Sequence, residues 1–183
     1  MGKEIERKFL VKNVTYKSLA KGTYYRQGYV PTVNGMTVRI RIAGDRGFIT
    51  MKDHAVGFTR HEFEDPIPVD DAQQMLELMC AKPQIEKYRY KIPVSSSKFQ
   101  VSSNLATEKI SNAETLNLKP ETNPLYWEVD EFLGDNAGLV VAEIEVPSED
   151  TVFDIPDWIG EEVTGDKRYY NSHLCNNPYK NWK

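Results

Sequence analysis

The sequence predicts a mostly β protein whose strands close into a barrel with charged side chains on the inside. Strand-like segments with period-two alternation dominate the chain, and 10 Tyr and 7 Phe favour β structure. Same-sign charges spaced two residues apart recur on most of these segments. The chain has 183 residues, which is typical of one domain with a sizeable core. We therefore expect a single domain over residues 1–183.

Alternation of apolar and polar residues places eight strands along the chain. Asn34-Gly35 and Gly44-Asp45-Arg46-Gly47 are hairpin turn signals between consecutive strands. The predicted strands are Lys3–Val11, Tyr24–Val30, Met36–Ile42, Gly47–Lys52, Thr59–Val69, Gln84–Ile92, Leu125–Phe132 and Val140–Pro147.

Three helices are predicted between and after these strands. Asp70 is a suitable N-cap for a helix over Asp71–Ala81, which Lys82-Pro83 ends. Its apolar residues Met75, Leu76 and Met79 fall on one face. Pro156-Asp157-Trp158 begins a short helix, and Thr164 caps another over Gly165–Leu174.

One segment, residues 94–124, fits neither period. It is rich in Ser, Asn and Thr, and it joins two predicted strands. Connections of this length are often functional. We expect a long inserted loop that either borders one mouth of the barrel and tunes substrate choice, or decorates the outer wall.

Composition excludes several classes of protein. The net charge of −4 gives no bulk attraction to nucleic acid. No apolar run is long enough to span a bilayer, and the charged N-terminus is not a signal peptide. Cys80 and Cys175 are expected to be free thiols. We expect a cytoplasmic protein that binds neither nucleic acid nor membrane.

The charge pattern is the most informative feature. A strand places residues i and i+2 on one face, about 6.8 Å apart. Each charged face backs onto apolar or aromatic residues such as Ile40, Phe63 and Val129. The charges in phase are Glu4, Glu6 and Lys8, then Arg39 and Arg41, Glu62 and Glu64, Lys87 and Arg89, Glu128 and Asp130, and Glu143 and Glu145, with Lys52 ending a further strand.

A solvated sheet face is the usual meaning of a charged strand. Solvated faces normally mix Thr, Ser, Gln and Lys, whereas here same-sign pairs recur on successive strands. Like charges at about 4 Å cost roughly 4 kcal/mol at an effective dielectric near 20. A barrel with the charged faces inward resolves this cost, because acidic and basic strands then meet across a wet lumen.

The charged side chains of the predicted lumen indicate which ligands it binds. Carboxylate clusters are hard oxygen donors that suit Mg²⁺ or Mn²⁺. Arg and Lys clusters suit phosphate oxygens. The expected guest therefore carries several phosphates and divalent metal.

The ordered motifs resemble the triphosphate tunnel metalloenzymes, also called the CYTH superfamily, and are most similar to its short bacterial branch. Glu4-Ile5-Glu6-Arg7-Lys8 resembles the family's ExExK signature, and the resemblance covers nearly the whole chain. Only the segment 94–124 departs from it, being longer than the family's usual connection. The other matching stretches are Val38–Arg41, Thr50–Lys52, Ile85–Tyr90, Trp127–Asp130, Ala142–Val146 and Gly160–Tyr169.

The resemblance implies an eight-stranded antiparallel β-barrel open as a tunnel, with helices outside, that acts on triphosphate groups with divalent metal. It implies one metal held by Glu4, Glu6 and Glu145, and a second, which positions the attacking water, supported by Glu143 and Asp130. Lys87 joins Glu143 and Asp130 as an expected catalytic residue. Phosphate oxygens are expected to contact Lys8, Arg39, Arg41, Lys52, Lys87, Arg89 and Lys167, while Glu62, Glu64 and Glu128 balance the basic strands.

The expected activity is hydrolysis of inorganic tripolyphosphate by a Mg²⁺- or Mn²⁺-dependent enzyme. A class IV-type adenylate cyclase and a thiamine or nucleoside triphosphatase are the enzymatic alternatives, because they differ only in what lies beyond the phosphates. The non-enzymatic alternative is a polyphosphate- or nucleotide-binding module, although phosphate binding alone does not require the acidic pairs. The partner is a small-molecule triphosphate, and a homodimer is compatible with the sequence.

Overall fold

The computed structural model describes residues 5–33, 35–52, 62–94 and 124–182. These residues form one nine-stranded sheet in the order β5-β4-β3-β2-β6-β7-β8-β1-β9, and every pairing is antiparallel. The mostly β prediction is confirmed. The strands are β1 (Ile5–Val11), β2 (Thr23–Val30), β3 (Thr37–Ala43), β4 (Arg46–Lys52), β5 (Glu62–Ile67), β6 (Ile85–Pro93), β7 (Tyr126–Phe132), β8 (Val140–Val146) and β9 (Ile159–Glu162).

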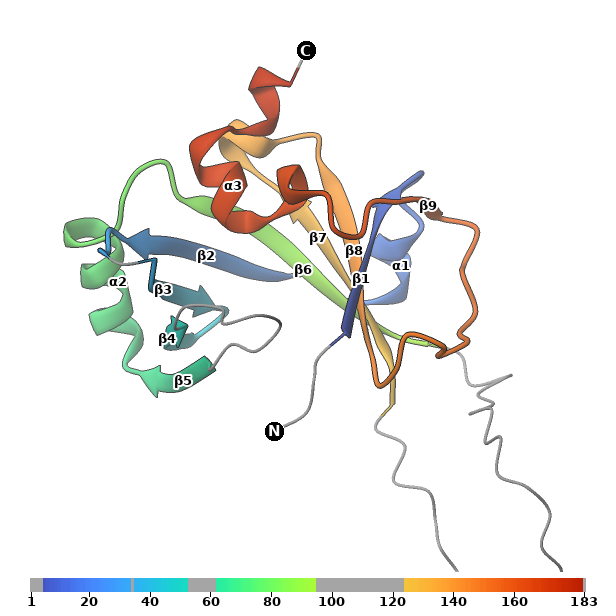
Figure 1. Cartoon of the computed structure of the whole chain (residues 1–183), viewed down its shortest axis with the longest axis horizontal. Coiled ribbons are helices and arrows are strands. Elements are labelled where there is room, and N and C mark those ends of the chain that lie inside the picture. Colours follow the sequence, from blue (N-terminus) through green and yellow to red (C-terminus); the bar gives the residue numbers. More distant parts are fainter. Residues whose placement is uncertain (1–4, 34, 53–61, 95–123, 183) are drawn as a thin grey trace, which may run out of the picture.

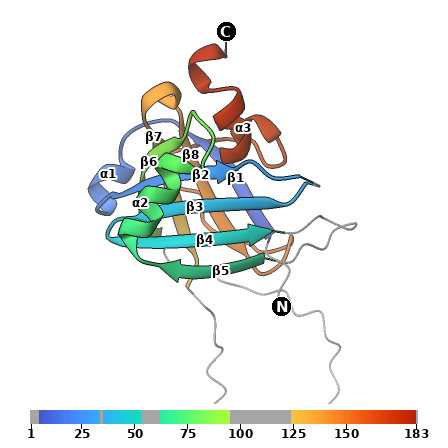
Figure 2. The ribbon, with the colours of Figure 1, turned by 90° about the vertical axis from the view of Figure 1, so that its left-hand side faces the viewer.

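The sheet curves around one concave face. The sheet has two wings: β2–β5 form one, and β7, β8 and β1 form the other. In Figure 1 the two wings lie on opposite sides, with β6 between them. Figure 2 shows the β2–β5 wing face on, with α2 (Val69–Leu78) across its outer surface. The sheet does not close into the predicted barrel: among the described residues, β5 and β9 are its two edges and do not pair with each other. A C-terminal segment, Tyr170-Asn171-Ser172, lines the cavity between the wings.

All eight predicted strands correspond to observed strands within the described residues. The ninth, β9, was not predicted, and the helix expected from Pro156 to Trp158 is wrong. Trp158 is 5% exposed and packs edge-on against Trp127, while Lys12 N donates to Trp158 O at 2.9 Å. Burial of Trp158 and Ile159 therefore holds this chain extended along β1.

The helices are shorter than the sequence predicts, and their positions differ in part. α2 begins at Val69 and ends at Leu78, and it buries Ala72 and Leu76 against β3. Met79, expected on the buried face, is 55% exposed because the helix has already ended. The predicted helix over 165–174 is a 3₁₀ turn, η2 (Lys167–Tyr169), followed by α3 (Asn171–Asn176). The remaining short elements are α1 (Tyr16–Leu19), η1 (Gly134–Asn136) and η3 (Tyr179–Asn181).

The alternation predicted for the strands is observed as two faces. The outward residues of β1, β7 and β8 pack into an apolar core with Tyr16 and Trp158, and Trp127 and Ile144 are almost fully buried there. On β6, β7 and β8 the inward face changes from charged to apolar along the strand. It is charged toward one end and apolar at the other, where Ile85, Phe132 and Val141 pack against Tyr169 and Leu174 of the C-terminal segment. The apolar end of this face therefore lies next to the charged end and closes it off from one side.

Both cysteines are free thiols, as predicted. Cys80 is buried under α2 beside Gly28, and Cys175 lies on α3. In the part of the chain that the structure describes, no helix is long and apolar enough to cross a membrane.

Candidate active site: a charged cavity between the wings

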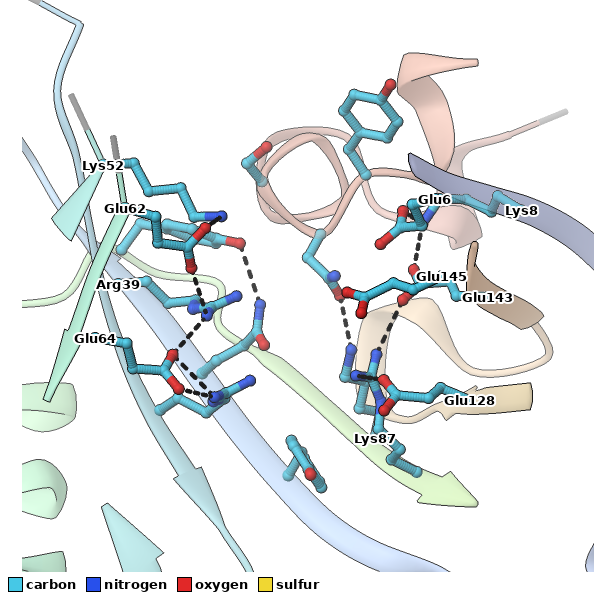
Figure 3. Close-up of a pocket in the computed structure, with 18 residues that line it drawn as sticks. Glu6, Lys8, Arg39, Lys52, Glu62, Glu64, Lys87, Glu128, Glu143 and Glu145 are labelled. Atoms are coloured by element: carbon cyan, nitrogen blue, oxygen red, sulfur yellow. Dashed lines mark hydrogen bonds and ion pairs between the residues drawn. The ribbon is translucent and has the colours of Figure 1, made fainter. Parts of the chain in front are cut away.

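The concave face encloses a cavity of about 570 Å³. Figure 3 shows its lining, with β4 and β5 side chains facing those of β1 and β8 across the opening. Among the residues that the structure describes, six basic and six acidic side chains line it, so these described charges balance. They are Lys8, Arg39, Arg41, Lys52, Lys87 and Arg89, against Glu6, Glu62, Glu64, Glu128, Glu143 and Glu145.

The β3–β5 wall carries two arginines gathered on one carboxylate. Arg39 Nη2 lies 3.1 Å from Glu64 Oε2, and Arg41 Nη2 lies 2.8 Å from Glu64 Oε1. The Thr50 hydroxyl donates to the same carboxylate at 2.7 Å. Burial opposes ionisation of Glu64, but the Thr50 hydrogen bond and both guanidiniums outweigh it and lower the pKa of Glu64. Farther along this wall, Lys52 forms an ion pair with Glu62.

The two arginines keep unused donors. The Nε atoms of Arg39 and Arg41 are buried and have no hydrogen-bond partner among the residues that the structure describes. Burial and the neighbouring Arg39 lower the pKa of Arg41. A buried donor without an acceptor is costly. An anion with several oxygens would therefore be stabilised at this wall.

The opposite wall is built from β1 and β8, paired so that Lys8 faces Glu143 and Glu6 faces Glu145. The Lys8 ammonium lies 3.1 Å from Glu6 Oε1 and also contacts Glu143. Burial and the charge of Glu143 raise the pKa of Glu6, although Lys8 opposes them. Directly opposed like charges are destabilising in a sheet. On this wall the carboxylates of Glu6 and Glu143 share Lys8, and Arg89 on β6 also reaches Glu143.

The floor of the cavity is a buried ion-pair network. Lys87 Nζ lies 2.5 Å from Asp130 Oδ2, and the side chains are 2% and 1% exposed. Arg89 donates to both Asp130 oxygens at 2.6 Å and reaches Glu143 at 3.1 Å, and it also contacts Glu128. Burial lowers the pKa of Lys87 to about 8. Burial opposes ionisation of Asp130, but Arg89 and Lys87 lower its pKa to about 2.

The donor set suits a hard divalent cation. Glu6, Glu143 and Glu145 occupy one face of two paired strands, and carboxylate oxygens are the preferred ligands of Mg²⁺ and Mn²⁺. In the described ranges, no three acidic, His or Cys side chains already converge as a metal site. The Lys8 ammonium stands between Glu6 and Glu143 instead. Burial and the neighbouring Glu143 raise the pKa of Glu6, and this unfavourable placement of a carboxylate is the observation that fits a cation.

Most of the site residues predicted from sequence are brought together. Two described ones are not on the cavity surface. Asp130 lies beneath it as the counter-ion of Lys87 and Arg89, and Lys167 is exposed on η2 outside the lining. Glu4 lies outside the described residues, as do 95–123 of the predicted inserted loop. Those lining the cavity are Glu6, Lys8, Arg39, Arg41, Lys52, Lys87, Arg89, Glu143 and Glu145.

Sequence reasoning missed six uncharged lining residues. Tyr25, Gln27 and Tyr29 alternate along β2 in the same phase as the charges on the neighbouring strands, so their spacing would have identified them. Gln27 Nε2 donates to the Tyr29 hydroxyl at 3.1 Å. Tyr170, Asn171 and Ser172 follow no period, and only the packing of the C-terminal segment places them at the cavity.

Comparison with known proteins gives a consistent result. A sequence model of the CYTH domain matches residues 2–170. An inorganic triphosphatase of Acetivibrio thermocellus is 49% identical over 183 residues, covering 100% of this chain and 99% of the relative. An inorganic triphosphatase of Nitrosomonas europaea is 33% identical over 176 residues, covering 94% and 96%. A crystal structure of an inorganic triphosphatase superposes with a TM-score of 0.62 at 30% identity, covering 96% and 95% of the two chains.

Proposed function

This chain belongs to the CYTH domain family, and we propose that it is a metal-dependent hydrolase of inorganic triphosphate. The observation that carries the proposal is the balanced cavity. One wall holds two arginines whose buried Nε donors are unused among the described residues, and the opposite wall holds the carboxylates of Glu6 and Glu143 around Lys8. A triphosphate with divalent metal complements both walls. The activity of two relatives, both inorganic triphosphatases that match nearly the whole chain, supports the same substrate.

Hydrolysis of a triphosphate requires mainly that the phosphates and the attacking water are positioned and that the phosphate charge is neutralised. Arg39, Arg41 and Lys52 would bind phosphate oxygens from one wall, and Lys8 and Arg89 from the other. Lys87 would contact the reacting phosphoryl group from the floor. In such a site the phosphates replace carboxylates as partners of the cations, and the expelled water strengthens each contact.

A divalent cation would be held by Glu6, Glu143 and Glu145, with Glu4 as a further expected ligand. When bound, Mg²⁺ or Mn²⁺ neutralises charge on phosphate oxygens and lowers the pKa of coordinated water. Lys8 and Arg89 both contact Glu143 and hold its carboxylate in the position from which it would bind the cation. Asp130 acts beneath the surface by holding Lys87 and Arg89; a direct role as a metal ligand stays a prediction.

We further propose that the chain works as one domain in the cytoplasm on a small-molecule substrate. The cavity lining is polar or charged throughout, with Tyr25, Tyr29 and Tyr170 as its aromatic members. Twelve of the 18 lining residues that the structure describes are charged, which complements a polyanion more than an uncharged ring. This favours triphosphate alone over ATP cyclisation or hydrolysis of thiamine triphosphate.

Phosphate release from tripolyphosphate, ATP and thiamine triphosphate tests the proposal. With Mg²⁺ or Mn²⁺ present, we expect the highest kcat/KM for tripolyphosphate, phosphate and diphosphate as products, and loss of turnover in EDTA. A search for cyclic AMP in the ATP reaction covers the cyclase. Tight binding of tripolyphosphate without release of phosphate under either metal would identify a binding module and refute the proposal.

Arg41→Ala tests the phosphate-binding wall. The guanidinium of Arg41 contacts Glu64 and is available to a phosphate oxygen. Hydrogen bonds to charged groups contribute about 1.5–3 kcal/mol, so we expect KM for tripolyphosphate to rise roughly 10- to 100-fold with a smaller change in kcat. Steady-state kinetics at fixed Mg²⁺ measures both constants.

Arg26→Ala is the matched control, because Arg26 forms an ion pair with Glu77 and does not line the cavity. Its KM should stay within twofold of the wild-type value. Arg41→Lys should give an intermediate KM, since Lys keeps the charge but not the planar fork of donors. A normal KM in Arg41→Ala would remove Arg41 from the substrate-binding set.

A further inference from the structure

The C-terminal segment contributes a side chain to the floor of the cavity. Tyr169 and Leu174 are buried in the apolar end of the inward face, against Ile85 and Phe132. Between them, Tyr170, Asn171 and Ser172 line the cavity. Tyr179 N donates to Asn136 Oδ1 at 2.8 Å, which ties the following turn to the η1 loop. The segment is therefore anchored on both sides of its cavity-lining residues.

Asn171 reaches the buried ammonium of Lys87. The Asn171 Oδ1 atom accepts a hydrogen bond from Lys87 Nζ at 3.2 Å. An ammonium has three N–H donors and no acceptor, so only the amide oxygen of Asn171 can face it. On its other side, Lys87 Nζ lies 2.5 Å from Asp130 Oδ2. Two of the three Lys87 donors are therefore directed at partners on different elements, β7 and α3.

The two partners differ in charge and in origin. Asp130 holds the ammonium against the sheet, and Arg89 shares the same carboxylate. With Asp130 alone, a flexible four-carbon side chain keeps rotational freedom about one contact. Asn171 fixes a second direction without adding a negative charge to a cavity built for phosphates. With two of its N–H groups held by Asp130 and Asn171, the Lys87 ammonium has a fixed direction for its third N–H.

We infer that Asn171 is a positioning residue for Lys87, through which the anchored C-terminal segment sets the direction of the third Lys87 donor. The inference rests on the proposed triphosphatase function, because it assigns Asn171 a role in that reaction. It acts through Lys87 and requires no contact of its own with the substrate. The residue type matters: an amide oxygen accepts from the ammonium, while a carboxylate there would also repel a polyanion.

Three variants test the inference by separating kcat from KM. In Asn171→Ala, Lys87 loses its second anchor, and misplacement of a reacting group by about 1 Å costs up to roughly 100-fold. We expect kcat for tripolyphosphate to fall roughly 10- to 100-fold, with KM within threefold of wild type. Asn171→Asp keeps an acceptor for Lys87 and adds a negative charge, so kcat should largely be kept while KM rises. Asn177→Ala, on an exposed residue after α3, should match wild type in both constants.

A second readout does not depend on activity. The ¹³Cε NMR signal of Lys87, assigned by its loss in Lys87→Arg, should shift in Asn171→Ala and not in Asn177→Ala. If the wild-type protein fails to hydrolyse tripolyphosphate but this signal shifts in Asn171→Ala, the proposed function is wrong while the contact between Asn171 and Lys87 is confirmed. An unshifted signal overturns the inference. A wild-type kcat in Asn171→Ala also overturns it. A fall in kcat with an equally large rise in KM and a lowered melting temperature overturns it too, because that pattern would indicate a merely structural role.

Discussion

Asp130→Asn is expected to lower the free energy of unfolding by about 3–5 kcal/mol, the range observed when one partner of a buried ion pair is removed. Asp130 is fully buried and is the shared counter-ion of Lys87 and Arg89. An amide keeps the size but not the charge, and it turns one oxygen into an NH₂ group that faces cationic donors. Urea unfolding followed by tryptophan fluorescence measures the change.

The sign of the pH dependence follows from the same residue. The pKa of Asp130 is lowered to about 2 in the folded protein, below the 3.8 of an unperturbed Asp. Its stabilising contribution is therefore present above about pH 4 and is lost as the pH falls from about 4 to about 2. Asp130→Asn should flatten the acid limb of the stability profile across that window.

Asp65→Asn is the control for size and chemistry, because Asp65 is exposed on the edge strand β5. Its free energy of unfolding should change by no more than about 0.5 kcal/mol. If Asp130→Asn were as stable as this control, the buried charges of Lys87 and Arg89 would not depend on Asp130 for their stability. The ion-pair account of the cavity floor would then be wrong.

Sequence spacing predicted the fold well where side chains alternate strictly. Arg39 and Arg41 on β3 and Glu143 and Glu145 on β8 point into the cavity because period-two spacing and burial of the intervening Ile40 and Ile144 leave no other register. The same reasoning failed at Trp158, where a local Pro-Asp signal predicted a helix. There, packing of the indole against Trp127 dominates over local preference.

The sequence could not predict how deeply each charged side chain is buried. Glu128 and Asp130 have the same spacing and the same phase, yet Glu128 lines the cavity and Asp130 lies beneath it. The difference arises because Asp130 has the shorter side chain and is clasped by Arg89 and Lys87. The position of Asn171 likewise depends on where Leu174 packs, which no local pattern encodes.

Glu6→Gln is expected to lower kcat for tripolyphosphate roughly 100-fold at a fixed, low concentration of Mg²⁺, a loss equal to about 2.7 kcal/mol. The carboxylate of Glu6 faces Glu145 across the β1–β8 pair and shares Lys8 with Glu143. Gln keeps the shape and one oxygen but removes the charge that would attract a divalent cation. Because the other carboxylates remain, higher Mg²⁺ should restore part of the lost turnover. A titration of turnover against Mg²⁺ measures the shift, and Mn²⁺ binding without substrate measures the cation affinity directly.

Glu162→Gln is the matched control, since Glu162 lies on β9 and pairs with Arg7 outside the cavity. Its metal titration should superimpose on that of the wild-type protein. If Glu6 served only to neutralise Lys8, the variant would lose turnover equally at every Mg²⁺ concentration, and Mn²⁺ affinity would be unchanged. Full activity of Glu6→Gln at low Mg²⁺ would exclude Glu6 from both roles and would leave Glu143 and Glu145 as the acidic wall on which a cation depends.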